Sequence, residues 1–446
     1  MRGIRSQGRH ASTGPERGLG ACCIAILVGL LLAPVAARAQ YIPSYFSPGV
    51  PGYGEQMGVT VVTRVRPLYE EPGLRFEDWI VHPDLDESTG YNSNILGLAG
   101  GPSSAVVETN PSLTINSDWS RDSLGAAISA DNFQYPGSPK QNETDVQAAI
   151  GGGYTIGLSN LDLAYAHVAQ HELPTDIGAP PSSTPLPYDV DDLRSDYTFD
   201  LGRLKITPNL EYQHWQFGST TIGGVTSDQA FRNRSVYQGG VAFRYELSGK
   251  TSLLLVTQGI SSQFVKQQAG QPSLSSSGGL VLTGIDYQYS GLWRYQLLVG
   301  ASVREYAAAE FKTRASPVAQ ATVIWTPTGL TTVTGSVLRT IQDPTAEATS
   351  GFNYTTAQLR IDHEYLPNVL LDVEGGVENG DYFEGGTQTL YYGGGGASWL
   401  LNRWLRLSAH YQFTHGNGSQ SQTTGTTVTS SPYTQNLILF GLHVGL

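Results

Sequence analysis

The chain has 446 residues, with 26 lysines and arginines against 38 aspartates and glutamates and a net charge of −12. This acidic balance argues against nucleic-acid binding, which needs basic clusters to neutralise phosphates. Charged residues make up only 14% of the chain, against roughly a quarter in an average soluble domain. Beyond residue 37 no apolar run reaches the length of about 20 residues that a transmembrane helix needs.

Residues 1–39 have the pattern of a secretory signal peptide. Four arginines precede the apolar stretch 22–37, and Ala37-Arg38-Ala39 provides a small-residue cleavage site. The alternative is an N-terminal membrane anchor. Residues 1–39 hold five arginines and one glutamate, so the rest of the chain has a net charge of −16. It also holds both cysteines, so we expect the exported chain to have no disulfide, no thiol nucleophile and no cysteine-bound metal.

Residues 40–73 are rich in proline, glycine and tyrosine and show no sustained hydrophobic period. We interpret them as a periplasmic N-terminal arm. The alternative is that they fold into the interior of the following domain as a plug.

Residues 74–446 alternate between apolar and polar side chains. In the stretch 293–304, for example, Trp293, Tyr295 and Leu297 alternate with arginine and glutamine. A period of two residues indicates strands. Most of the predicted strands have about 13–15 residues, more than the roughly 9–11 that a tilted strand needs to cross a bilayer. They lie at 76–95, 104–119, 123–135, 144–158, 161–173, 188–201, 204–217, 232–247, 252–265, 275–289, 292–306, 314–326, 330–343, 350–365, 369–382, 387–401, 404–415 and 434–446.

The predicted connections alternate between short and long. Short turns include Ser159-Asn160 and Pro367-Asn368, whereas 174–187 and 416–433 are long and polar. This asymmetry is typical of outer-membrane barrels. We therefore predict that residues 74–446 form an all-β, transmembrane, antiparallel up-and-down β-barrel of about 18 strands, with 16 as the alternative count and both termini in the periplasm. The competing fold is a large secreted solenoid or sandwich.

The strand predicted at 434–446 has a continuous apolar face formed by Phe440, Leu442, Val444 and Leu446. In a barrel, lipid covers such a face and the first strand, near residues 76–95, pairs with the free edge. Closure is required because lipid offers no partner to an unpaired backbone group.

The alternation also assigns charged residues to the inner face. On the strands at 350–365 and 369–382, one arginine faces up to five carboxylates. Either these charges pair across strands and stiffen the wall, or they select or bind the solute. Few aromatic residues point inward by this pattern, and most face lipid as interface girdles. The predicted lumen-lining residues are Arg234, Arg244, Asp286, Arg294, Arg304, Arg360, Asp362, Glu364, Asp372, Glu374, Glu378, Arg406 and His410.

No motif predicts catalysis. The glycine run 393–396 lacks the Lys-Ser/Thr of a phosphate loop. His167 and His171 would lie about 13 Å apart on a strand, too far to share a metal. No Ser/His/Asp set is ordered by the sequence. We therefore predict no catalytic residue, no cofactor and no metal site, and a protein that is not an enzyme.

The region between residues 61 and 135 resembles the start of the putative beta-barrel porin type 2 family over about 75 residues. It departs from the family pattern at Glu77, where glycine is usual, and at Ser93, where aspartate is usual. The matching residues are Arg64, Arg66-Pro67, Tyr69, Gly73, Arg75, Pro83, Tyr91-Asn92, Asn94-Ile95, Ser117-Asp118-Trp119-Ser120 and Tyr135.

Members of this family resemble Gram-negative outer-membrane pores that are encoded with exopolysaccharide synthesis and export machinery. The resemblance implies a translocation channel for an exported polysaccharide. A general diffusion porin for small hydrophilic solutes is the alternative, and a structural surface barrel or an outer-membrane enzyme comes third. The expected partners are outer-membrane lipid, the barrel assembly machinery and periplasmic polysaccharide-export proteins, without nucleic acid.

Overall fold

The computed structural model describes residues 50, 59–267, 270–289, 291–343, 349–421 and 427–446. Two short 3₁₀ turns, η1 (Pro139–Gln141) and η2 (Ala230–Arg232), accompany the strands. None of the helices in the described residues is long and apolar enough to cross a membrane. The strands are β1 Leu74–Phe76, β2 Trp79–Asn92, β3 Ser104–Ser117, β4 Ser123–Gln134, β5 Glu143–Ile156, β6 Ser159–Glu172, β7 Leu186–Asp200, β8 Leu204–Phe217, β9 Ser219–Ile222, β10 Val225–Asp228, β11 Arg234–Ser248, β12 Thr251–Phe264, β13 Ser276–Tyr289, β14 Trp293–Tyr306, β15 Arg314–Thr328, β16 Thr331–Gln342, β17 Phe352–Leu366, β18 Val369–Tyr382, β19 Thr387–Leu400, β20 Leu405–Ser421 and β21 Thr427–Gly445.

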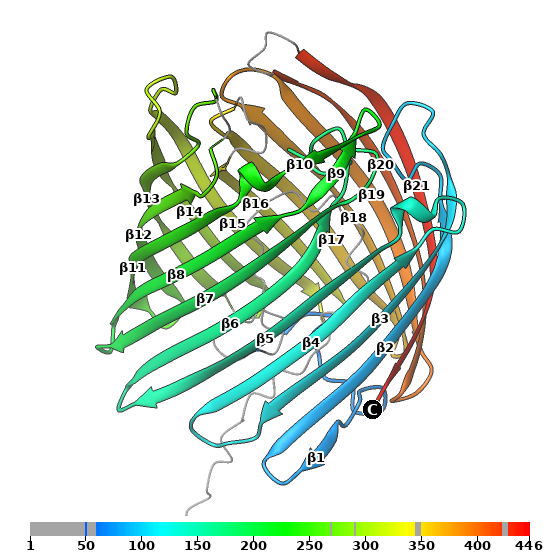
Figure 1. Cartoon of the computed structure of the whole chain (residues 1–446). Coiled ribbons are helices and arrows are strands. Elements are labelled where there is room, and N and C mark those ends of the chain that lie inside the picture. Colours follow the sequence, from blue (N-terminus) through cyan, green and yellow to red (C-terminus); the bar gives the residue numbers. More distant parts are fainter. Residues whose placement is uncertain (1–49, 51–58, 268–269, 290, 344–348, 422–426) are drawn as a thin grey trace, which may run out of the picture.

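Eighteen of these strands form one closed antiparallel barrel, as the sequence predicted (Figure 1). Each strand from β2 to β8 and from β11 to β21 pairs with the next, and β8 pairs with β11. The ring closes where β2 pairs with β21, from Asp84↔Gly445 to Asn92↔Leu437. We call this pairing the seam. The hairpin β9–β10 and the short β1 are additions to the ring.

Strand connections are short at one end of the barrel and long at the other, which is drawn uppermost in Figure 1. We call these the short-turn end and the long-loop end. Two sequence expectations need correction. The turn after β5 uses residues 157–158 rather than Ser159-Asn160, because Ile156 pairs with Ser159. The segment 416–433 is not one long loop, since β20 and β21 continue to pair as far as Ser421↔Thr427; threonine-rich polar stretches extend strands readily.

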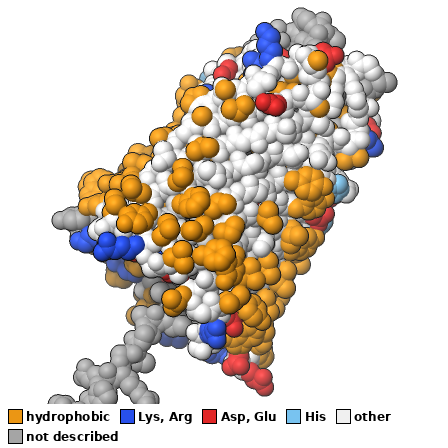
Figure 2. Space-filling view, turned by 90° about the vertical axis from the view of Figure 1, so that its left-hand side faces the viewer, with side chains coloured by type: hydrophobic (Ala, Val, Ile, Leu, Met, Phe, Trp, Pro, Cys, Tyr) orange, Lys and Arg blue, Asp and Glu red, His pale blue; other side chains and the backbone are white. Residues whose placement is uncertain are grey.

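The outer face of the barrel is apolar, and Figure 2 shows hydrophobic side chains spread over one side of it. Parts of the strands alternate between exposed and buried side chains, as on β14, where Leu297 and Val299 flank the buried Leu298. Aromatic pairs gather toward the two ends. Trp293 stacks on Trp325 near the short-turn end, and Tyr212 packs on Tyr237 nearer the long-loop end. Such bands match the interfaces of a bilayer.

The inner face at the long-loop end is rich in aromatic side chains, so the expectation of few inward aromatics is wrong there. Tyr188, Trp215 and Phe217 stack with ring centroids 5.6–6.2 Å apart. The polarity of β7 reverses toward this end, where Tyr188 and Val190 are buried and Asp189 is exposed. Loops cover the inner face at this end, so apolar residues are stable inside.

Glu77 lies in the turn between β1 and β2 and has a φ of 53°, the only positive φ of a non-glycine residue in the described part of the chain. This conformation is uncommon for residues with a Cβ. It gives a physical reason for the glycine that the resembled family usually has at this position.

We predict that Glu77→Gly stabilises the barrel by about 0.5–1 kcal/mol, because glycine adopts a positive φ without steric cost. Equilibrium unfolding by urea in lipid vesicles measures the change. Asp78→Gly, at the neighbouring turn residue, is the control and should not stabilise. A stability unchanged by Glu77→Gly contradicts the assignment of strain.

We predict that Gly90→Ala weakens the seam. A Cβ at Gly90 would lie 1.8 Å from the carbonyl oxygen of Ile438 on β21, and overpacking of this kind costs about 1–3 kcal/mol. The same substitution at Gly249, where a Cβ meets nothing within 4 Å, is the matched control. The fraction of heat-modifiable, folded barrel on cold electrophoresis reports the difference, and equal folding of the two variants contradicts the prediction.

Candidate pore interior

The charged residues predicted to line the lumen all lie on the faces of their strands opposite the exposed apolar residues. They do not form one ring. Arg234 and Arg304 lie near the long-loop end, whereas Asp372 and Glu374 lie in the half of β18 nearer the short-turn end. Arg244 and Arg294, the other two predicted arginines of β11 and β14, lie near the short-turn end, so the arginines of these strands are spread along the height of the wall. Whether these residues line a conducting passage stays a prediction.

Arg360 on β17 lies at the centre of a group formed with Asp362, Asp372 and Glu374, which we call the acidic wall. Its guanidinium donates to Asp362 at 2.9 Å and to Glu374 at 3.1 Å, and lies 3.8 Å from Asp372. The ladder dictates this grouping, because Arg360 pairs with Glu374 and Asp362 with Asp372 across β17 and β18. A shallow pocket beside them is lined by His410 and by Val61 of the N-terminal segment. Three carboxylates around one guanidinium make this part of the wall electronegative.

The two arginines of the long-loop end are joined by an aspartate that the sequence did not single out. Asp343 follows β16 and accepts from Arg234 at 3.1 Å and from Ser262, and it lies 3.5 Å from Arg304. Both arginines are almost fully buried. The predicted strand 330–343 includes Asp343, but β16 ends at Gln342, so Asp343 lies beyond the ladder, where strand periodicity gives no direction for a side chain.

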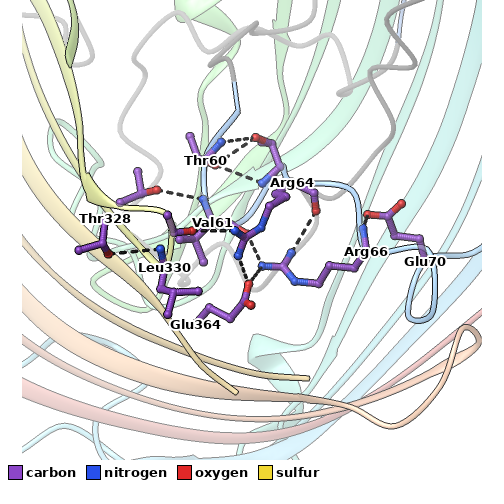
Figure 3. A network of polar contacts seen from close by, with 11 residues as sticks. Thr60, Val61, Arg64, Arg66, Glu70, Thr328, Leu330 and Glu364 are labelled. Carbon is purple, nitrogen blue, oxygen red and sulfur yellow. Dashed lines mark hydrogen bonds and ion pairs between the residues drawn. The ribbon is translucent and has the colours of Figure 1, made fainter. Parts of the chain in front are cut away.

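Residues 59–73, which belong to the predicted arm or plug, contact the inner wall. Arg64 and Arg66 both donate to Glu364 on β17 (Figure 3), the second at 2.8 Å. The amide of Val61 donates to Thr332 on β16 at 2.9 Å. We call residues 59–73 the inner segment. Glu364, predicted from β17 as one of five carboxylates facing Arg360, instead binds this segment.

The apolar side chains of the same region extend these contacts. Val61 is buried with Leu370 and Leu400, with Tyr69 packed against them. Further along the interior, Val50 is buried against Ala166 and Trp215 on the wall formed by β4–β8 and β11. The described parts of the N-terminal region therefore contact two separate stretches of the wall.

The inner segment ends at the seam. His443 on β21 contacts Glu71 through Nε2 at 2.5 Å and Asp86 on β2 through Nδ1 at 2.9 Å. Burial raises the pKa of Glu71, but hydrogen bonds with His443 and Asp84 outweigh it and lower the pKa below its usual value. Glu71 is therefore ionised at neutral pH. Arg406, predicted to line the lumen, lies 3.9 Å from Asp86 in the same group.

The loop between β6 and β7 crosses the mouth at the long-loop end. Ile177 is buried with Phe352, Tyr382 and other residues of β17–β19 and β21. Ile177 packs closely on Gly380 of β18, where an added Cβ would lie only 2.7 Å from Cγ2 of Ile177. The amide of Gly178 donates to Gln388 on β19 at 2.8 Å. β18 lies nine strands from β7 in either direction around the ring, so the loop reaches the opposite wall.

The remaining predicted residues have local partners. Arg244 pairs with Asp286 at 2.7 Å, and Glu378 accepts from the hydroxyl of Tyr354 at 2.9 Å. Arg294 is partly buried near the short-turn end of β14, and His410 is buried beside the acidic wall. Much of the charge of the inner face is thus paired across strands or between elements, as one of the two interpretations of the sequence expected.

His167 and His171 do not share a site. His167 contacts Asp191 at 2.8 Å, and His171 contacts Asp145 at 2.9 Å. The first pair is partly exposed to solvent.

We predict that Arg360→Ala lowers the free energy of unfolding by about 2 kcal/mol, because three carboxylates lose the guanidinium between them. Arg360→Lys should recover only part of this loss, since an ammonium cannot bind several carboxylates in a planar fork. Arg403→Ala, in an exposed turn, is the control. Urea unfolding in vesicles measures all three. A loss no greater than that of Arg403→Ala means that the network does not stabilise the wall.

Solved structures of other barrels resemble this one weakly. The FrpB iron transporter of Neisseria meningitidis (F5-1 variant, apoprotein form) is 9% identical, with a TM-score of 0.43 over 84% of this chain and 82% of that chain. OccK2 (OpdF) of Pseudomonas aeruginosa is 11% identical, with a TM-score of 0.45 over 83% of this chain and 99% of that chain. OccAB2 of Acinetobacter baumannii is 9% identical, with a TM-score of 0.43 over 83% of this chain and 98% of that chain. At this level they say nothing about a solute.

Among curated proteins none matches the sequence. The model of one protein family, described as putative beta-barrel porin 2, matches residues 66–442. The match covers the inner segment from Arg66 and all eighteen strands of the ring as far as β21. The closed barrel, its apolar outer face and this match all indicate an outer-membrane β-barrel protein. The chain belongs to the putative beta-barrel porin 2 family of outer-membrane β-barrel proteins.

Proposed function

We propose that this outer-membrane barrel is a gated translocation channel for an exported polysaccharide, with its termini and short turns in the periplasm. The observation that carries the proposal is the inner segment held against the inner wall by Glu364 and at the seam by His443. A passive pore for small solutes gains nothing from such an obstruction. A channel for a long polymer needs a gate, because an empty barrel of eighteen strands would leave an aqueous channel through which small solutes pass.

The two ends of the interior are narrowed by different elements. The inner segment occupies the short-turn end, where it acts as the plug considered from the sequence. The loop carrying Ile177 covers the long-loop end and docks on the opposite wall. The segment is held by Arg64 and Arg66 on Glu364, by the amide of Val61 on Thr332 and by Glu71 on His443. The loop is held by the apolar packing of Ile177 and by the amide of Gly178 on Gln388. These contacts lie outside the strand ladder of the ring, so the segment and the loop can detach while the barrel stays folded.

The polar inner wall suits a hydrated carbohydrate. Along the acidic wall, Arg360, Asp362 and Glu374 present donors and acceptors on a rigid sheet, and Ser398 lines the pocket between them. Polymer export also agrees with the resemblance of residues 61–135 to pores encoded with exopolysaccharide machinery. Periplasmic export proteins would then meet the inner segment and release it.

We predict that the wild-type protein shows little steady conductance in planar bilayers. The triple variant Arg64→Ala/Arg66→Ala/Ile177→Asp should conduct strongly, because it removes both bonds to Glu364 and places a charge in the apolar docking site of the loop. Arg75→Ala, which breaks an exposed ion pair with Asp118 just beyond the same segment, is the matched control and should stay closed.

A large constant conductance of the wild type favours the general diffusion porin instead. The cargo is tested on the open triple variant by adding dextran fragments of increasing length to one side. A polymer conduit gives current blockades whose duration grows with fragment length, and blockades independent of length contradict polysaccharide transport.

A further inference from the structure

We propose that Glu71, Asp84 and His443 form a binding site for a zinc ion that holds the inner segment to the seam. One ligand atom from each residue lies within 4.8 Å of the others. The three come from the inner segment, from β2 and from β21, so the site joins the first and last strands of the ring to the segment inside it. One imidazole and two carboxylates form a ligand set that zinc accepts.

The histidine is oriented as in a metal site. Its Nδ1 donates to Asp86 at 2.9 Å, and its Nε2 lies 2.5 Å from the ionised Glu71, so the hydrogen on Nε2 is the one that a metal ion would displace. Histidines that bind metals almost always donate their second ring N–H to such an acceptor, which fixes the tautomer and raises the basicity of the ligating nitrogen. This partner on β2 is not part of the ligand set, so it is an independent feature of the site.

The local charge also favours a cation. Three carboxylates, those of Glu71, Asp84 and Asp86, surround one imidazole, and the nearest guanidinium, Arg406, lies 3.9 Å from Asp86. The buried Oδ1 of Asp84 has no hydrogen-bond partner in the described part of the chain. Glu71 and Asp84 hydrogen-bond each other, which requires a proton on one of the two carboxyl groups. A divalent ion would displace this proton and supply the unpartnered oxygen with a partner.

Gly445 leaves room for the two carboxylates to approach. A Cβ at this position would lie 2.3 Å from the carboxyl carbon of Glu71 and 2.5 Å from Oδ1 of Asp84. The absence of a side chain on β21 is therefore a condition for the site. Small side-chain movements bring ligand atoms to the spacing of about 3.3 Å expected around tetrahedral zinc, and the fourth position is left for water.

Zinc binding is measured by isothermal titration of the full mature chain in detergent micelles. We expect Glu71→Gln, Asp84→Asn and His443→Gln each to abolish one equivalent of bound zinc, and Asp86→Asn to weaken it about 10- to 100-fold. His167→Gln removes a histidine that pairs with a single aspartate and is the matched control, with no expected change. His171→Gln tests the other histidine–carboxylate group, formed with Glu143 and Asp145.

Three results overturn the site: no zinc bound by the wild type, zinc lost only in His171→Gln, or calcium bound in place of zinc. Because a variant can fail to fold, cobalt is also added to the unaltered protein. Visible absorption bands of a nitrogen- and oxygen-ligated cobalt ion are expected, and their absence again overturns the site.

The proposal that zinc holds the inner segment to the seam rests on the proposed plug, and it is tested separately by conductance. Zinc should lower the conductance of the open triple variant at least several-fold and leave it unchanged when His443→Gln is added. Bound zinc without any change in conductance overturns the holding role. Failure of the triple variant to conduct overturns the plug itself, and this is distinguishable because zinc binding is measured without current.

Discussion

Every backbone N–H and C=O within the bilayer must find a partner in the protein, and the seam between β2 and β21 is where this requirement is met for the whole molecule. An open sheet of the same strands would leave two edges unpaired in lipid, at several kcal/mol for each unsatisfied group. The pairing from Asp84 to Asn92 removes both edges at once. All other features of the structure depend on this closure, since it creates an inside and an outside.

The seam also binds the inner segment, as β16 and β17 do through Thr332 and Glu364. His443, Asp86 and Asp84 face inward at its short-turn end and meet Glu71 of the inner segment. Gly445 lets the carboxylates of Glu71 and Asp84 approach there, and Gly90, further along the seam toward the long-loop end, lets β2 approach β21. Barrel closure and retention of the segment therefore use the same few residues, so assembly of the wall and filling of the interior are physically linked.

The interior is held together by charges that are individually modest but grouped. Arg360 gathers three carboxylates, Glu364 gathers two arginines, and Asp343 joins two arginines from distant strands. The last two groups connect residues outside the regular ladder to the wall. They supplement the apolar contacts that Val61 and Ile177 make with the inner wall.

The sequence by itself determined the barrel: its eighteen strands, their inward and outward faces, and the grouping of Arg360 with Asp362 and Glu374. These follow from local rules, because a period of two fixes the face and a short turn fixes which strand lies alongside. Only the tertiary structure decided that Glu364 binds Arg64 and Arg66, that Asp343 joins Arg234 to Arg304, and that Ile177 docks nine strands away. These partners lie in segments without periodicity or on opposite walls. Their contacts exist because closing the ring brings distant residues into one enclosed space, and no local pattern encodes that proximity.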